Sequence, residues 1–324
     1  REASIFVVAP ATADFMARVA HGHADDLLTA CLLANSSPVL LVPAMNDRMW
    51  ANAQTVRNTR HLRELGYDVL DPDTGPLAAG EGQGPGRMPE PEAIMTRIAR
   101  MLEQTGSLRG KRVVVTAGAT REPIDPVRFI SNHSSGRMGI AIAEAAWRRG
   151  ADVTLIAGHL EVPVGAPVEV RHAETTATMR DAVESAIGSA DVLVMAAAPA
   201  DYRPVRIASQ KIKKGSGSAP VIELEHTDDI LKSTIAARKA GAVIVGFALE
   251  TENLVEHGEA KLLDKKLDLI VVNSATEEGA GFRTDTNRVT ILGRDGASES
   301  IPLMQKTELA DVILDRVESL LNGR

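Results

Sequence analysis

Polar and glycine residues gather in one stretch of the chain, residues 111–139. Its apolar start, residues 112–116, predicts a buried strand that runs into a turn at Gly118. A polar loop follows and leads to a helix expected from Ile140; the loop carries Arg128, Asn132, His133, Ser134, Ser135, Gly136 and Gly139. Glycine tolerates positive φ and lets a phosphate approach the amides at a helix start. The stretch therefore predicts a nucleotide-binding turn, with a tight turn that holds no ligand as the alternative.

Basic residues stand in two further places that could face this turn. Lys211, Lys213 and Lys214 follow a proline-interrupted stretch and precede a Gly-Ser run, which is typical of a mobile loop. On such a loop the ammonium groups could fold over a triphosphate and neutralise its oxygens. Lys261 and Lys265 are four residues apart and so share a helix face, where their like charges repel each other. Such a pair has a function only if it binds an anion. A solvated surface is the simpler alternative for both groups.

A dinucleotide-dependent oxidoreductase is the main rival, because it also begins with a strand, a glycine turn and a helix. Two features argue against it. The glycines do not form a contiguous G-x-G-x-x-G, and the second strand ends in Ala157-Gly158-His159 rather than in an acidic residue. The lysine clusters also favour a nucleoside triphosphate over NAD(P)H.

Alternating strands and helices must position these residues. From Lys111 onward we expect strands at residues 112–116, 152–157, 168–172, 192–196, 243–247 and 269–272, and helices at 140–149, 176–186, 229–239 and 254–266. A late hairpin is expected from residues 288–292 and 299–303, before a final helix at 308–321. This alternation predicts an α/β domain with a doubly wound, Rossmann-like parallel sheet, whose ligands bind where the strands end. Polar residues do follow the fourth and fifth strands, in residues 197–203 and at Glu250.

Residues 1–105 alternate in the same way and predict a partial, flavodoxin-like α/β domain. We expect strands at residues 5–9, 39–43 and 68–70, and helices at 12–20, 24–34 and 91–104. The glycine-rich residues 75–91 are expected to form either a disordered connection or a flap over a site. A short linker, residues 105–110, joins the two domains; we assign residues 106–324 to the second domain, whose strands and helices begin at Lys111. The chain starts without methionine and almost directly in a strand, so we expect an opening strand and loop to be absent.

Composition limits the class of protein. A chain of 324 residues with 44% hydrophobic and 24% charged residues fits two soluble domains. It contains no apolar run of about 18 residues, so we expect a cytoplasmic protein that does not span a membrane. The net charge of −7 argues against a nucleic-acid partner. The single cysteine, Cys31, excludes an intrachain disulfide, and its leucine neighbours predict that it is buried.

Several long motifs closely resemble phosphopantothenoylcysteine synthetase. They are TAGATREPID at residues 116–125, RFISNHSSGRMG at 128–139, ADYR at 200–203, KIKK at 211–214 and VGFA at 245–248. The resemblance implies a ligase that uses CTP with Mg²⁺. CTP would activate the carboxylate of 4′-phosphopantothenate as an acyl-cytidylate, and the amine of L-cysteine would then displace CMP.

The resemblance also implies roles for single residues. Asn132 would hold the acyl-cytidylate, Lys211 would stabilise charge during attack on the α-phosphate, and Arg128 would support the acid. The remaining nucleotide-binding residues would be Gly118, Ser134, Gly136 and Gly139 at the phosphates, Lys261 and Lys265 near them, and Ala197, Asp201 and Phe247 around the cytidine. For Phe247, plain core packing at a strand end is the alternative.

The first domain resembles the flavin-dependent phosphopantothenoylcysteine decarboxylase. The motifs are APATA at residues 9–13, GHADDLL at 22–28 and PAMNDRMW at 43–50. They imply that FMN lies at Pro10, Ala11 and Thr12, and that Asn46 grips the substrate. Ala79 stands where the family commonly has its reducing cysteine, and the family's flavin-phosphate loop and catalytic histidine would precede Arg1.

Together the motifs resemble the bifunctional bacterial coenzyme A biosynthesis proteins over essentially the whole chain. The resemblance implies a homo-oligomer with dimeric synthetase and trimeric decarboxylase domains, which gives a dodecamer when both are complete. Two alternatives stay open. The first domain could be an FMN-binding oligomerisation scaffold beside an active synthetase, or the whole chain could be an assembly module without enzymatic activity.

Overall fold

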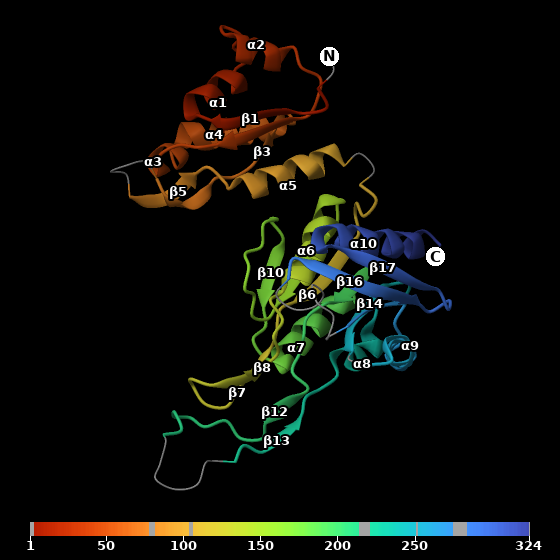
Figure 1. The fold of residues 1–324 in the computed structure, drawn as a ribbon. Helices are drawn as coiled ribbons and strands as arrows, with labels where there is room; N and C mark the ends of the chain where they lie inside the picture. Colours follow the sequence, from red (N-terminus) through yellow and green to blue (C-terminus); the bar gives the residue numbers. More distant parts are fainter. Residues whose placement is uncertain are drawn as a thin grey trace. The chain divides into compact units, whose positions relative to one another are not determined.

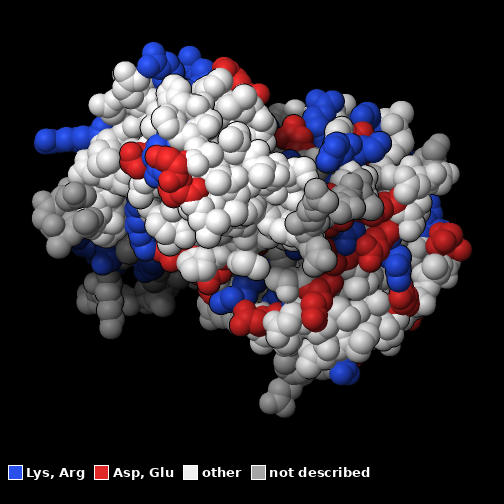
Figure 2. Space-filling model, turned by 90° about the horizontal axis from the view of Figure 1, so that it is seen from above, with Lys and Arg blue, Asp and Glu red and all other residues white. Residues whose placement is uncertain are grey.

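The computed structural model describes residues 3–77, 82–103, 106–213, 221–250, 252–274 and 284–323. The chain divides into two compact units, Arg1–Thr105 and Gly106–Arg324, which occupy the red-to-orange and yellow-to-blue parts of the colour scale in Figure 1. On the face that Figure 2 displays, basic and acidic side chains lie near one another in small mixed groups. Within the described ranges, no helix is long and apolar enough to cross a membrane.

The first unit is built on a small parallel sheet. Its strands are β1 (Phe6–Ala11), β2 (Val39–Pro43) and β3 (Asp68–Val69), in that spatial order. All five residues of β2 are buried, as expected for a central strand covered on both faces. Five helices accompany the sheet: α1 (Ala13–Ala20), α2 (Leu27–Leu33), α3 (Asp47–Trp50), α4 (Ala53–Glu64) and α5 (Pro91–Leu102).

Two predictions about these helices were wrong. The second helix begins at Leu27 rather than at residue 24, because Asp26 accepts a hydrogen bond from the Thr29 amide and caps it. Cys31 is exposed rather than buried. The buried side of α2 contains Thr29 and Leu32, and Cys31 lies two positions after Thr29, which places it on the opposite side of the helix.

The sequence reasoning also missed α3 and α4. The inner face of α4 consists of Thr55, Asn58, Thr59 and Leu62, so it has almost no apolar periodicity to detect. The glycine-rich stretch predicted as a loop contains an antiparallel hairpin, β4 (Asp73–Pro76) and β5 (Gln83–Arg87). Ala79 lies outside the described residues.

The second unit contains an eight-stranded sheet. Six parallel strands stand in the spatial order β10 (Glu169–His172), β9 (Asp152–Ala157), β6 (Arg112–Ala117), β11 (Val192–Met195), β14 (Val243–Glu250) and β15 (Leu269–Ser274). This is the strand order of the Rossmann fold. The antiparallel strands β16 (Thr286–Gly293) and β17 (Ser298–Gln305) extend one edge. The predicted α/β class, with its parallel sheet and late hairpin, is confirmed.

Helices cover both faces of this sheet. The core on one face includes apolar residues of α6 (Arg137–Arg148) and α10 (Lys306–Asn322), and the core on the other includes residues of α7 (Thr176–Ile187), α8 (Ile230–Ser233) and α9 (Leu254–Asp264). The expected single helix at 229–239 was wrong: α8 ends at Ser233, and a short 3₁₀ helix follows at Ile235–Ala237.

Two small hairpins extend from the sheet of the second unit (Figure 1). The first pairs β7 (Arg121–Pro123) with β8 (Phe129–Ser131), inside the predicted polar loop. The second pairs β12 (Tyr202–Pro204) with β13 (Leu224–His226), and β12 contacts β7. Both hairpins therefore lie on the side of the sheet where the parallel strands end.

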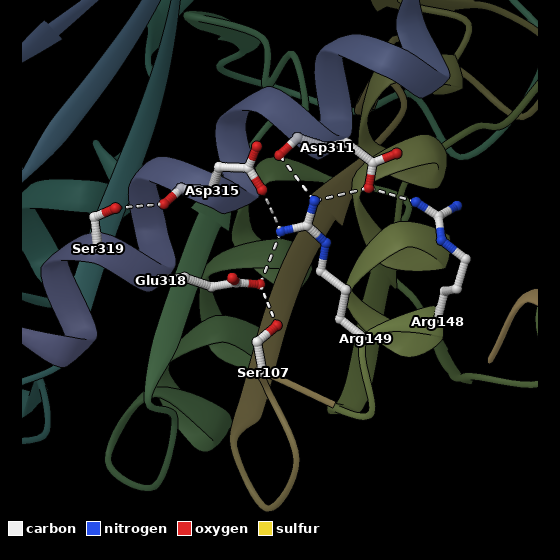
Figure 3. A network of polar contacts seen from close by, with 7 residues as sticks. All are labelled: Ser107, Arg148, Arg149, Asp311, Asp315, Glu318 and Ser319. Carbon is white, nitrogen blue, oxygen red and sulfur yellow. Dashed lines mark hydrogen bonds and ion pairs between the residues drawn. The ribbon is translucent and has the colours of Figure 1, made fainter. Parts of the chain in front are cut away.

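An ion network around the buried Arg149 joins the start of the second unit to α10 (Figure 3). Arg149, which is 9% exposed, donates to Asp311, Asp315 and Glu318 of α10. Ser107 Oγ donates to Glu318 Oε1 at 2.6 Å. Burial alone would lower the pKa of Arg149, but its hydrogen bonds to the three carboxylates raise it above its ordinary value. The guanidinium therefore stays charged.

Candidate functional site

A pocket of about 390 Å³ lies where the parallel strands of the second unit end. We call it the central pocket. It lies beside β6 and β11, the neighbours at which the strand order of the sheet reverses, and such switch points are where open α/β sheets bind ligands. Nine predicted site residues line it: Asn132, Ser134, Gly136, Gly139, Ala197, Asp201, Phe247, Lys261 and Lys265.

The positive end of α6 forms one wall of the central pocket. Gly136 is the N-cap residue and has a φ of +84°, a conformation that glycine adopts without strain. It provides no side-chain cap, and the first turn of α6 contains no acidic residue. The free amides and the helix dipole therefore favour an anion at this wall. The helix starts at Arg137, three residues before the predicted start.

Gly139 contributes close packing between α6 and the sheet. A Cβ atom at this position would lie 2.7 Å from the backbone oxygen of Thr116 and 2.6 Å from Cβ of Ala117. Gly118, with a φ of +81°, has a comparable role in the turn after β6, because a Cβ atom there would lie 2.3 Å from the backbone oxygen of His159. Gly118 does not line the central pocket and instead supports the turn behind its wall.

Hydrogen bonds hold the loops after β6 and β11 together. Oγ1 of Thr116 accepts from the Ala197 amide at 3.1 Å, and Oγ1 of Thr120 accepts from the Ala200 amide at 2.8 Å. Nδ2 of Asn132 donates to the backbone oxygens of Ala198 and Pro199, at 3.2 and 3.0 Å. These bonds fix the Asn132 amide at the pocket wall, beside a loop that comes more than 60 residues later in the chain.

A second chamber of about 300 Å³ adjoins the central pocket. The two share Ala197, Pro199, Asp201, Phe247 and Lys265 as lining residues. Phe247 is half-buried: it packs against the core of the sheet and also lines both chambers. The pair of chambers offers space for the two ends of an elongated ligand.

The lysines of α9 are not isolated cations. Nζ of Lys261 lies 2.5 Å from Oε1 of Glu250, and Nζ of Lys265 lies 3.0 Å from Oδ2 of Asp229. Both side chains still line the central pocket. A bound anion would therefore compete with a carboxylate for each lysine.

Arg128 and Lys211 do not line the central pocket, and both side chains are exposed. Nε of Arg128 donates to Oδ2 of Asp125 at 3.0 Å, and its Nη2 donates to the backbone oxygen of Ile212 at 3.0 Å. The Ile212 amide in turn donates to Oδ2 of Asp125 at 3.0 Å. This clamp fastens the segment that carries Lys211 to the β7–β8 hairpin. Lys214 lies outside the described residues.

Asp125 is the centre of the clamp and escaped the sequence reasoning. Its carboxylate is buried, and it also accepts from the amides of Val127 and Arg128, both at 2.9 Å. The Arg128 guanidinium and these amides hold the pKa of Asp125 far below its ordinary value. The clamp is therefore intact across the neutral pH range.

Four polar residues of the central pocket were also not predicted: Arg137, Asn273, Asn287 and Lys306. Asn287 belongs to the antiparallel strand β16, and Lys306 is the first residue of α10. The rule that ligands bind where parallel strands end makes no prediction for an antiparallel edge strand, so Asn287 was not selected. Lys306 also precedes the predicted start of its helix, so it read as a connecting residue.

The predicted residues of the first unit lie at one edge of its sheet. Pro10 and Ala11 end β1, Thr12 caps α1 by accepting from the Phe15 amide at 3.2 Å, and Asn46 caps α3 after β2. The Met45 amide donates to the backbone oxygen of Gly86 at 2.9 Å, which anchors the β4–β5 hairpin beside this edge. Thr12 is exposed and Asn46 half-buried, so their polar groups fit the edge of a bound cofactor.

The described residues contain no group of three or more His, Cys, Asp or Glu side chains arranged to hold a metal ion.

The fold and the pocket define a class: an α/β protein of two units, the second of which has an anion-favouring site at its switch point. Family models match the same two parts. The Flavoprotein model matches residues 1–103, and the model of the DNA/pantothenate metabolism flavoprotein C-terminal domain matches residues 108–321.

Similar proteins extend over both units. The coenzyme A biosynthesis bifunctional protein CoaBC of Mycobacterium bovis is 48% identical over 339 residues, covering 100% of this chain and 80% of that protein. Its counterpart in Bacillus subtilis is 42% identical over 322 residues, covering 98% of this chain and 78% of that protein. A crystal structure of the C-terminal domain of CoaBC matches 68% of this chain and 100% of its own, with 38% identity and a TM-score of 0.57. The chain belongs to the family of bifunctional coenzyme A biosynthesis proteins.

Proposed function

We propose that the second unit ligates 4′-phosphopantothenate to L-cysteine with CTP, and that the first unit decarboxylates the product with FMN. Family membership supports coenzyme A biosynthesis with ligase and decarboxylase activities. The central pocket supports a nucleoside triphosphate as the ligand, because Asn132, Lys261 and Lys265 line it together with the positive end of α6. An NAD-dependent oxidoreductase would instead be expected to have a contiguous G-x-G-x-x-G and an acidic residue after the second strand, where this chain has Ala157-Gly158-His159.

The two chambers suggest how CTP lies. In our proposal the cytosine contacts Asp201 and Phe247, which the chambers share, and the phosphates lie against Ser134 and the amides that follow Gly136. Lys261 and Lys265 exchange their carboxylate partners for phosphate oxygens. Mg²⁺ bound with CTP would neutralise phosphate charge and make the α-phosphorus more electrophilic.

The ligation needs two substitutions, because a carboxylate has no leaving group suited to attack by an amine. In the first, a carboxylate oxygen of phosphopantothenate attacks the α-phosphorus, and pyrophosphate leaves. In the second, the amine of cysteine attacks the acyl carbon, and CMP leaves with the bonding electrons. We assign Lys211 to the charge that develops in the first step, once its clamped segment approaches the pocket, and Asn132 to holding the acyl-cytidylate. Arg128 secures that segment and supports the acid.

For the first unit, we propose that FMN lies at Pro10, Ala11 and Thr12, with the substrate at Asn46. A bound flavin supplies two-electron redox chemistry. The residues of this chain contribute binding and orientation: the Thr12 hydroxyl and the Asn46 amide stand on neighbouring loops, because β1 and β2 pair in parallel.

One assay tests the ligase proposal. Pyrophosphate release is measured with each of the four nucleoside triphosphates, with and without phosphopantothenate and cysteine. We expect release with CTP only when phosphopantothenate is present, and CMP release only after cysteine is added. An Asn132→Asp variant should release pyrophosphate and accumulate or misuse the acyl-cytidylate. Release from ATP but not from CTP would refute the proposal.

A further inference from the structure

Two basic side chains stand together in the wall of the central pocket, at the ends of different helices. Arg137 is the first residue of α6, and Lys306 is the first residue of α10. Lys306 is only 6% exposed, and its Nζ donates to the backbone oxygen of Thr284 at 2.6 Å. Burying an ammonium group is unfavourable unless the structure or a ligand compensates its charge.

Among the described residues, Asp285 is the carboxylate that pairs with Arg137. Nη1 of Arg137 lies 2.7 Å from Oδ1 of Asp285, whose side chain is 73% exposed and therefore well solvated. Nε of Arg137 is buried and has no hydrogen-bond partner among the described residues. Burial, and secondly the charge of Arg137, lower the pKa of Lys306 to about 8, although Asp285 acts in the opposite direction. Counted over the described residues, this part of the wall thus has two basic side chains beside one well-solvated carboxylate.

Asp201 also lines the pocket, but it belongs to the wall that is shared with the adjoining chamber. Lys261 and Lys265 of α9 are positive and already paired with Glu250 and Asp229. The N-terminus of α6 lies at the same wall and adds the positive end of a twelve-residue helix, without a capping side chain. Arg137, Lys306 and the α6 amides therefore converge on one region that favours a multiply charged anion.

We propose that Arg137 and Lys306 form a subsite for the β- and γ-phosphates of the nucleotide, which leave together as pyrophosphate. The subsite rests on the proposed ligase function and extends it to residues of α10. When the carboxylate oxygen bonds to the α-phosphorus, the bond from that phosphorus to the bridging oxygen breaks, and its electron pair moves to the pyrophosphate. The leaving group thereby gains negative charge next to two cations, which stabilise it.

Calorimetric titration of the full chain with inorganic pyrophosphate, CTP and CMP tests this subsite. The variants are Lys306→Met, Arg137→Met and, as a control, Lys239→Met, whose lysine pairs with Asp191 just before the start of β11, at the opposite end of the strand from the pocket. We expect each pocket variant to bind pyrophosphate and CTP about 10- to 100-fold more weakly, because it loses a charge-assisted bond to phosphate. Binding of CMP should change by less than about threefold, and the control should match the wild type.

Three outcomes separate the subsite from the ligase proposal. If wild type releases pyrophosphate from CTP, but both pocket variants bind pyrophosphate as wild type does, the subsite is refuted and the ligase stands. If CMP binding falls as much as CTP binding, the residues do not act on the β- and γ-phosphates, and the subsite is again refuted. If CTP is not used, yet pyrophosphate binding still weakens selectively in both variants, the ligase proposal fails and the anion subsite is supported. Should Lys306→Met fail to fold, Arg137→Met carries the test, because its side chain is 37% exposed.

Discussion

Replacing Arg149 by methionine tests whether the network between α6 and α10 secures the second unit. The guanidinium Nη1 donates to Asp315 and Glu318, both at 2.8 Å, and Nη2 donates to Oδ1 of Asp311 at 2.9 Å. Methionine fills similar space but leaves three carboxylates without their shared cation. Removing one partner of a buried ion pair costs about 3–5 kcal/mol.

The exposure of the carboxylates reduces this value. The side chains of Glu318, Asp311 and Asp315 are 18%, 36% and 55% exposed, so water solvates part of the charge that Arg149 leaves behind. We therefore expect a loss of about 2–4 kcal/mol in the free energy of unfolding of the second unit. For a domain of this size, that corresponds to a fall in melting temperature of about 5–15 °C.

Arg148 provides a matched control. It lies next in the chain, its side chain is 27% exposed, and its ion pair is with Asp311. Arg148→Met should cost about 1 kcal/mol or less, because the pair is only partly buried and Asp311 keeps its bond from Arg149. Scanning calorimetry gives the melting temperatures, and fluorescence of Trp147, buried in α6, follows urea unfolding of the same region. Equal losses in the two variants would refute the reasoning, as would a failure of Glu318→Gln to recover part of the stability in the Arg149→Met background.

Three further predictions concern the pocket. Asp125→Asn should slow pyrophosphate formation roughly 100-fold, because a displacement of the Lys211 segment by about 1 Å can have an effect of that size. Stopped-flow assays should show a lower rate and little change in CMP affinity. An unchanged rate would exclude the clamp from catalysis. The pKa of Lys306, about 8 in the folded state and 10.5 as the ordinary value, means that the unfolded chain binds more protons between these limits. Stability should therefore rise from pH 7.5 to 9.5 by about 2 kcal/mol more in wild type than in Lys306→Met, measured by urea unfolding, and a constant difference would contradict this. Gly139→Ala should destabilise the second unit by about 1–3 kcal/mol through overpacking against Thr116, and a melting temperature equal to that of the wild type would show that α6 can shift freely.

Nine of the residues predicted for the site line one pocket, because ligand-binding side chains in such sheets follow the ends of parallel strands. Apolar segments predicted five of the six parallel strands to within two residues, and the polar residues that follow them converge at one edge of the sheet. Their spatial order could not be read from the sequence. β6 and β11 are neighbours in the sheet, and this brings Asn132 into contact with Pro199. The pairing of these two strands depends on contacts between segments that are far apart in the chain.

The end of α8 could not be predicted, because side chains compete with the helix for a backbone oxygen. The helix expected at 229–239 stops at Ser233, where Oγ1 of Thr234 and the Arg238 guanidinium both donate to the backbone oxygen of Leu231. These side chains occupy the carbonyl that a longer helix would need. Lys306 was missed for a different reason. A lysine at the start of an amphipathic helix is normally expected to be exposed, and the sequence does not show that the folded chain buries this one.

The bond between Ser107 and Glu318 joins residues 211 positions apart in the sequence. Closing so long a loop is entropically unfavourable, so this contact and the docking of α10 should form late in folding. The six parallel strands precede α10 in the chain, so during synthesis they can assemble before α10 has been made. The wall that contains Lys306 is then still missing, and the nascent chain cannot have a complete central pocket until α10 has emerged.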